Sequence, residues 1–149
     1  TCQNATFIQC TALKRALVSS PLTYTNSSFS QCSMLHDVTL ENLQVIGSSM
    51  FYNCSALEEL TIPESVTRID SSAFRECLVL GKIYINRITA PAVAVEAFGN
   101  GSTVYTGVSN PAGTNILYVP EGATGYDEGE WLDPLQAEGK CNFTISYTL

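Results

Sequence analysis

Four cysteines recur at almost constant spacing along this sequence. They stand at positions 10, 32, 54 and 77, so the intervals between them are 22, 22 and 23 residues. A constant interval of this length is typical of a repeat architecture, whereas the ligands of a metal site usually stand a few residues apart. No two cysteines form a C-x-x-C pair. The spacing therefore predicts a chain built from units of 22 to 23 residues.

Each of these cysteines lies in the same pattern, F-x-x-C-x-x-L. The four copies are Phe7, Cys10 and Leu13; Phe29, Cys32 and Leu35; Phe51, Cys54 and Leu57; and Phe74, Cys77 and Leu80. A fifth, degraded copy begins at Phe98, where Gly101 replaces the cysteine. Three and five residues after each leucine stand apolar residues, and this alternation is typical of a strand. Each unit is therefore predicted to contain one strand.

A short polar residue stands three residues before each phenylalanine: Asn4, Asn26, Ser48 and Ser71. Such side chains can accept hydrogen bonds from the free N–H groups at the start of a helix, so each phenylalanine is predicted to lie in a short helical or 3₁₀ turn. One strand and one turn cannot bury their own apolar side, and neighbouring units must stack. We therefore expect an α/β repeat: a solenoid with a parallel β-sheet on one face and short helical or 3₁₀ turns on the other. Pro63 and Pro120 mark points where the backbone leaves the ladder of strands.

The stretch from Ile46 to Ile85 reads IGSSMFYNCSALEELTIPESVTRIDSSAFRECLVLGKIYI. It resembles the BspA-type leucine-rich repeat of bacterial surface proteins. The segment from Ile116 to Trp131 is similar to the way such arrays close in Bacteroides-like proteins, so the chain resembles the C-terminal part of an array. The resemblance implies a leucine-rich-repeat solenoid that is extracellular or located at the bacterial cell surface, binds other molecules and has no catalytic residues.

The chain of 149 residues has the size of one domain. We expect residues 1–149 to form a single leucine-rich-repeat domain, with repeats over about 2–120 and a C-terminal cap over about 121–149. In this cap, Tyr126 and Trp131 are predicted to cover the last coil, because terminal repeats need a lid. The alternation of apolar and polar residues from 143 to 149 predicts a final strand.

Two further regions carry expectations about the ends of the array. Residues 99–115 are rich in turn-forming residues and are predicted to form a protruding loop or hairpin. No equivalent of the C-terminal lid precedes Cys2. An end-to-end contact at this uncapped N-terminus is therefore a further expectation.

The charge of the chain limits its partners. Seven Lys and Arg residues against fourteen Asp and Glu residues give a net charge of -7. This charge repels phosphate backbones, so nucleic acid is not expected as a partner. No window approaches the ~20 consecutive apolar residues of a membrane span, and none is expected in this chain.

The residues that usually carry chemistry favour a structural interpretation. The four repeated thiols are predicted to project into an apolar interior, where buried thiols are inert. His36 is the only histidine and is predicted to lie on the surface, which removes most acid–base schemes. We therefore expect no catalytic residues, no metal site and no cofactor.

The outward side of the predicted sheet offers candidate binding residues. One stripe contains His36, and the next contains Arg15, Asp37, Glu59 and Lys82, in which Arg15 with Asp37 and Glu59 with Lys82 are opposite charges on adjacent strands. A third stripe contains Tyr84 and Tyr118, near Tyr105 of the 99–115 loop. Outward aromatic residues are enriched where proteins bind partners.

Three functions remain open from the sequence. The first is a non-enzymatic cell-surface or secreted binding and adhesion module that engages a protein ligand, such as a host or extracellular-matrix protein, through the sheet face and the 99–115 loop. The second is a carbohydrate-binding module that uses Tyr84, Tyr118 and Tyr105. The third is a purely architectural fragment of a longer repeat array.

Overall fold

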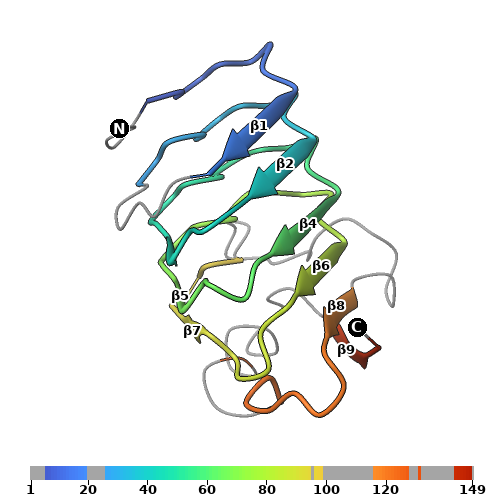
Figure 1. Ribbon diagram of the computed structural model, residues 1–149. Helices are drawn as coiled ribbons and strands as arrows, with labels where there is room; N and C mark the ends of the chain where they lie inside the picture. The colour runs from blue at the N-terminus through green and yellow to red at the C-terminus, as the bar shows by residue number, and fades with distance from the viewer. Residues whose placement is uncertain are drawn as a thin grey trace.

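The strands of successive repeats lie one after another along one face of the molecule (Figure 1). The computed structural model describes residues 6–19, 26–94, 96–98, 116–127, 131 and 143–148. The strands on this face are β1 (Arg15–Val18), β2 (Asp37–Leu40), β4 (Glu59–Ile62), β6 (Lys82–Ile85), β8 (Ile116–Val119) and β9 (Thr144–Tyr147). The predicted strand of each repeat and the predicted C-terminal strand are therefore present.

All strand pairs on this face are parallel, as predicted. They form two sheets, β1-β2 and β4-β6-β8-β9. Equivalent residues of successive repeats face each other, so that Leu60 pairs with Ile83 and Ile83 with Leu117. These three side chains are buried, because alternate residues of a strand point to opposite faces and this set points inward. One continuous sheet was expected, and the division between β2 and β4 corrects that expectation.

A second set of short parallel strands runs along another side of the coils (Figure 1). It consists of β3 (Val45–Ile46), β5 (Arg68–Ile69) and β7 (Ala92–Val93), in the order β3-β5-β7. Ile46, Ile69 and Val93 are buried at equivalent positions. These strands were not predicted, because two residues are too short for a recognisable alternation.

The segments around the repeated phenylalanines are turns, and the prediction of helical or 3₁₀ turns was wrong. Residues 6–19, 26–94 and 96–98 contain no helical turn. In the third coil, Met50 N donates to Gly47 O (3.1 Å) and Cys54 N donates to Phe51 O (3.2 Å). Ser49 and Asn53 have φ values of 55° and 54°. A left-handed residue at every fourth position is incompatible with a right-handed helix, so the described repeats contain strands and turns only.

Asn26, one of the polar residues expected to cap helices, instead joins two neighbouring coils. The side-chain oxygen Oδ1 of Asn26 accepts a hydrogen bond from the N–H of Ser48, its equivalent in the next coil, over 3.0 Å. Main-chain bonds join the same coils, since Phe29 N donates to Met50 O and Gln31 N donates to Tyr52 O. The capping prediction was therefore wrong for Asn26. Asn4 lies outside the described residues.

The repeated phenylalanines form a continuous stack through the coils. Phe7, Phe29, Phe51, Phe74 and Phe98 follow one another with ring centroids 5.2 to 5.6 Å apart and ring planes inclined by 5° to 7°. Such offset stacking is a favourable arrangement of aromatic rings. The stack holds the coils at a constant separation on the side away from the strands.

The repeated cysteines lie beside this stack, and Cys32, Cys54 and Cys77 are buried, as predicted. Each also donates a hydrogen bond to the carbonyl of the phenylalanine one coil earlier: Cys32 Sγ to Phe7 O (3.0 Å), Cys54 Sγ to Phe29 O (3.2 Å) and Cys77 Sγ to Phe51 O (3.0 Å). Burial raises the pKa of the Cys54 thiol to about 12. The cysteines are therefore packing residues that also connect the coils.

Tyr126 and Trp131 cover the C-terminal end of the stack, as predicted. Both are buried, and Trp131 lies against the ring of Phe98 with centroids 6.2 Å apart. Tyr126 Oη donates to Arg87 O (2.8 Å) and Trp131 Nε1 donates to Pro91 O (2.6 Å), so both polar groups are satisfied. The predicted 99–115 loop with Tyr105, and the N-terminal end at Cys2, lie outside the described residues.

None of the described residues belongs to a helix long and apolar enough to cross a lipid bilayer.

Candidate binding site

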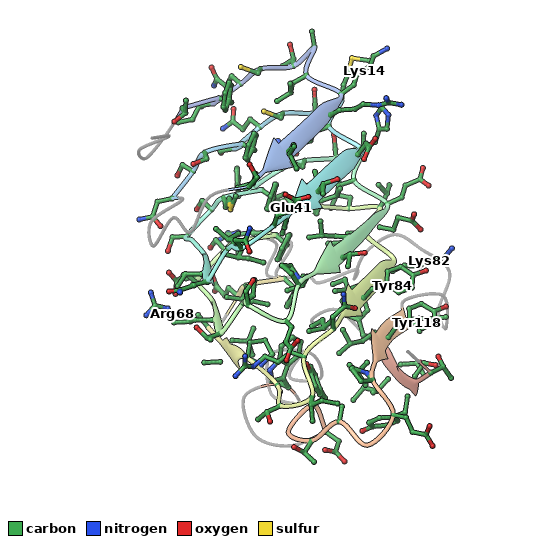
Figure 2. The ribbon with its side chains drawn as sticks, viewed as in Figure 1. Lys14, Glu41, Arg68, Lys82, Tyr84 and Tyr118 are labelled. Carbon is green, nitrogen blue, oxygen red and sulfur yellow. The ribbon has the colours of Figure 1, made fainter. Side chains whose placement is uncertain are left out.

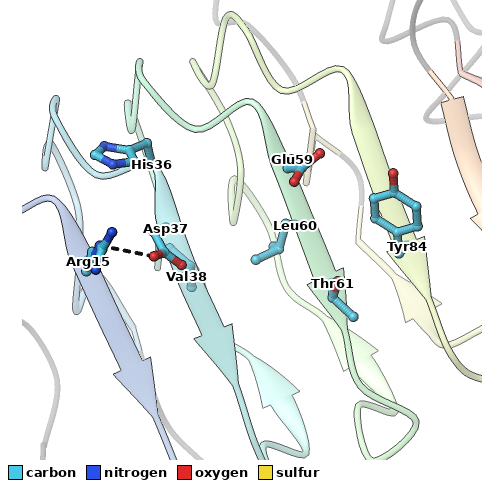
Figure 3. Close-up of a pocket in the computed structure, with 8 residues that line it drawn as sticks. All are labelled: Arg15, His36, Asp37, Val38, Glu59, Leu60, Thr61 and Tyr84. Atoms are coloured by element: carbon cyan, nitrogen blue, oxygen red, sulfur yellow. Dashed lines mark ion pairs between the residues drawn. The ribbon is translucent and has the colours of Figure 1, made fainter.

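A pocket of about 310 Å³ opens on the outward face of the strands (Figure 3). It extends from β1 to β6 and is centred on the junction between β2 and β4. Its lining residues are Arg15, His36, Asp37, Val38, Glu59, Leu60, Thr61 and Tyr84. The pocket thus lies where the described strands divide into two sheets.

Main-chain hydrogen bonds that join the other strands are missing at this junction. At the start of β2, His36 N and Asp37 N donate to Lys14 O over 3.1 and 3.2 Å, and the same arrangement recurs at the start of β6, where the acceptor is Glu58 O. In the described part of the chain, no corresponding bond runs from Glu58 N or Glu59 N to the carbonyl of His36. The strands therefore leave a seam between β2 and β4.

Pro63 contributes to this seam. At the equivalent positions of other coils, Glu41 N donates to Val18 O (2.7 Å) and Asn86 N donates to Ile62 O (3.1 Å). Proline has no N–H, so Pro63 cannot donate to the carbonyl of Leu40. Pro120 stands at the next such position, and there the β6–β8 register ends one pair early, at Tyr84 and Tyr118. A proline thus follows the strand both where the ladder is absent and where it is one pair shorter.

The charged side chains of the pocket are unevenly paired. Arg15 Nε lies 3.2 Å from Asp37 Oδ2, but the two side chains are 79% and 52% exposed, so the pair contributes little to stability. Glu59 and Lys82 are register partners on β4 and β6. Within the described residues, however, the Glu59 carboxylate joins no ion pair and no side-chain hydrogen bond. In the pocket, the carboxylate of Asp37 is therefore paired with a cation, whereas the carboxylate of Glu59 is not.

Tyr84 and Tyr118 form an aromatic pair beside the pocket (Figure 2). Their ring centroids are 4.6 Å apart and their planes are inclined by 8°. Both rings are half-buried. Only Tyr84 lines the pocket. Tyr84 lies between its register partners Thr61 on β4 and Tyr118 on β8. Tyr118 therefore covers one face of the Tyr84 ring, and the pocket lies on the other side, toward Thr61.

The structure brings together five of the eight predicted binding residues in this pocket: Arg15, His36, Asp37, Glu59 and Tyr84. Lys82 is exposed on β6 and Tyr118 stacks on Tyr84, but neither lines the pocket. Tyr105 lies outside the described residues. His36 is exposed, as predicted, and its Nδ1 lies 3.0 Å from Met34 O.

Three pocket residues were not predicted as site residues. Val38 and Leu60 are the apolar residues three positions after the leucines of their repeats, and Thr61 follows Leu60 on β4. They line the pocket because the strands are not joined there, and Pro63 was the sequence signal that could have revealed it. No group of three or more potential metal ligands occurs among the residues that the structure describes.

The comparisons with known proteins identify the repeat. A BspA-type leucine-rich repeat region, in six copies, matches residues 1–101. The chain is also similar in structure to a leucine-rich repeat protein from Eubacterium ventriosum, with 18% identity and a TM-score of 0.49 over 81% of this chain and 33% of that protein, so it spans about a third of that protein's length. No curated protein matches the sequence. Because the repeat region extends over about two thirds of its length, the chain belongs to the BspA-type leucine-rich repeat family.

Proposed function

We propose that this chain is a non-enzymatic binding module, secreted or located at the cell surface, that engages a protein ligand through the outward face of its strands. The observation that carries the proposal is the pocket at the β2–β4 junction together with the stacked tyrosines beside it. Repeats of this class commonly serve in binding and are typically not catalytic. The predicted 99–115 loop is part of the proposed ligand-binding surface.

The chemistry of this face supports a protein ligand. A half-buried aromatic pair supplies rigid apolar area, while charged and hydroxyl groups surround it, and such a combination is typical of protein interfaces. The backbone of the face is held by the parallel ladders of β4, β6 and β8 and by the phenylalanine stack behind them. A ligand therefore meets a surface that needs little ordering upon binding.

The test is a screen of labelled protein against an array of extracellular-matrix and host surface proteins. We expect saturable binding to at least one protein, and at least a tenfold loss of affinity in Tyr84→Ala and in Tyr118→Ala, because truncation of a central aromatic residue costs about 2 kcal/mol or more. Tyr147→Ala is a matched control, since Tyr147 is exposed on β9, away from the pocket. Saturable binding that no substitution on this face weakens would contradict the proposal.

A second candidate is carbohydrate binding. The observation in its favour is the pair of nearly parallel rings of Tyr84 and Tyr118, since aromatic rings offer an apolar face together with a polar tip. A glycan array separates the two candidates. Glycan binding that Tyr84→Ala abolishes, with no protein bound, would favour the carbohydrate function. An array without hits would remove it.

A further inference from the structure

We infer that the pocket at the β2–β4 junction receives an arginine side chain of the protein ligand. This inference rests on the proposed function, because it names the group that the ligand presents to the same site. Three properties of the pocket support it: its unneutralised charge, its hydrogen-bond acceptors and the free face of Tyr84.

The charge in the pocket favours a cation. Asp37 and Glu59 occupy equivalent positions of successive coils, and both line the pocket. Arg15 pairs with Asp37 over 3.2 Å, whereas the Glu59 carboxylate has no cation within 4.0 Å among the described residues. Figure 3 shows Glu59 and Tyr84 on the same outward side as the Arg15–Asp37 pair. With a net charge of -7 on the whole chain, an acidic ligand is repelled and a basic one is attracted.

The hydrogen-bonding groups of the pocket favour a ligand rich in N–H donors. The Asp37 and Glu59 carboxylates only accept hydrogen bonds, and the hydroxyl groups of Thr61 and Tyr84 can also accept them. At the seam, the carbonyl of His36 receives no N–H from the start of β4. The cationic donor that lines the pocket, Arg15, is already engaged with Asp37. A guanidinium group carries five N–H donors in one plane and meets this surplus of acceptors.

Tyr84 distinguishes arginine from lysine. Tyr118 stacks on Tyr84 at 4.6 Å, so the other side of the Tyr84 ring adjoins the pocket. A planar guanidinium can lie on this ring while its edge meets Glu59, whereas an ammonium is a compact, strongly hydrated charge that does not stack in this way. We therefore expect arginine to bind more tightly than lysine.

The test uses short blocked peptides that differ only at the central residue, which is arginine, lysine, citrulline or glutamate. Citrulline keeps the shape of arginine and removes its charge. Binding is followed by amide chemical shifts of the ¹⁵N-labelled protein at low salt. We expect the arginine peptide to shift the amides of Asp37, Glu59, Thr61 and Tyr84, with about tenfold weaker binding of the citrulline peptide.

Substitutions then assign the recognition to Glu59. Glu59→Gln is expected to weaken binding of the arginine peptide about tenfold and to leave the citrulline peptide unaffected. Glu58→Gln is the matched control, because Glu58 is an exposed neighbour that does not line the pocket. Lys82→Ala is expected to strengthen binding, since it removes a positive charge at the register partner of Glu59 that repels the arginine of the peptide. Equal binding of the arginine and citrulline peptides, no binding of either, or no effect of Glu59→Gln would overturn the inference.

The outcomes separate this inference from the proposed function. A protein ligand that is lost in Tyr84→Ala, combined with peptides that show no preference for arginine, overturns the inference and leaves the proposed function intact. A protein ligand that binds independently of every residue on this face overturns both.

Discussion

The thiol of Cys54 donates a hydrogen bond to the main-chain carbonyl of Phe29, 25 residues earlier in the chain, over 3.2 Å. Both residues are buried, and the bond connects one coil to the coil before it. Cys32 and Cys77 make the same contact one coil earlier and one coil later. The carbonyl of Phe29 also accepts from the amide of Cys32 over 3.3 Å, so the thiol is its second donor and the one that comes from the next coil.

Cys54→Ala should therefore destabilise the protein by more than its small loss of volume suggests. The substitution removes one of the two donors to Phe29 O and leaves a small cavity, so we expect the free energy of unfolding to fall by about 2 kcal/mol. Cys54→Ser keeps a donor and should cost less. Urea unfolding followed by circular dichroism measures both. Cys10→Ala, at a half-buried equivalent position, is the control, and an equal loss in Cys10→Ala and Cys54→Ala would contradict the expectation.

The same thiol predicts how stability depends on alkaline pH. Burial raises the pKa of Cys54 from 9.0 to about 12 in the folded protein, so the folded state holds this proton after the unfolded state has lost it. The contribution of Cys54 to stability is fully present below pH 9 and declines as the pH rises toward 12, by at most ~1.4 kcal/mol per pH unit.

Thermal unfolding between pH 8 and pH 11 measures this decline. Tyr126, whose pKa is also raised by burial, adds a decline of the same sign above pH 10, so the wild-type curve alone does not isolate the thiol. The difference between wild type and Cys54→Ser does, because serine does not titrate there. A difference that stays constant over this range would contradict the assignment.

The recurring pattern was sufficient to predict much of the fold. Phenylalanine, cysteine and leucine at a constant interval leave little alternative to stacked units, because equivalent side chains must then meet equivalent side chains. This reasoning predicted the parallel strands, the buried thiols and the position of Tyr126 and Trp131 over the last coil. All three follow from the burial of apolar side chains, for which sequence periodicity is a direct signal.

The turns could not be predicted in the same way. Two residues after each phenylalanine the backbone has positive φ, at Gln9, Gln31, Asn53 and Glu76. Glycine and asparagine are the residues that signal this conformation, and only one of the four positions holds either of them. The short polar residues before each phenylalanine therefore suggested helix caps, although the side chain of Asn26 instead accepts a hydrogen bond from the next coil.

The pocket was predictable only in part, and for a different reason. The outward stripes gave the correct neighbours, as the Arg15–Asp37 ion pair shows. The equivalent pair of Glu59 and Lys82 was expected and does not form within the described residues. Whether two long exposed side chains meet depends on rotamers and on local strand separation, and residue spacing determines neither.

The phenylalanine stack predicts an unequal effect of identical substitutions. Phe51 is fully buried between Phe29 and Phe74, with centroids 5.6 and 5.5 Å away. Phe51→Ala should cost about 4 kcal/mol, as is usual for a buried aromatic residue. Phe7 is 37% exposed and contacts only Phe29 in the described stack, so Phe7→Ala should cost about half as much or less. Equal losses in chemical unfolding would show that the stack is not a continuous stabilising element.

Pro63 provides a direct test of the seam between β2 and β4. In Pro63→Glu the chain regains an N–H at the position where Glu41 donates to Val18 O over 2.7 Å and Asn86 donates to Ile62 O over 3.1 Å. We expect the new amide at position 63 to donate to Leu40 O and to exchange with solvent deuterium as slowly as the amides of Glu41 and Asn86. The new hydrogen bond stabilises the folded state by about 1 kcal/mol, and the loss of proline stabilises the unfolded state by about as much, because the unfolded chain gains conformational freedom. The free energy of unfolding should therefore change little.

Closing the seam should also protect the amide of Glu59 from exchange, because this amide has no bond to His36 O in the wild type. Rapid exchange at position 63, comparable with the exposed residue Glu121, would show that the missing N–H is not what keeps these two strands apart.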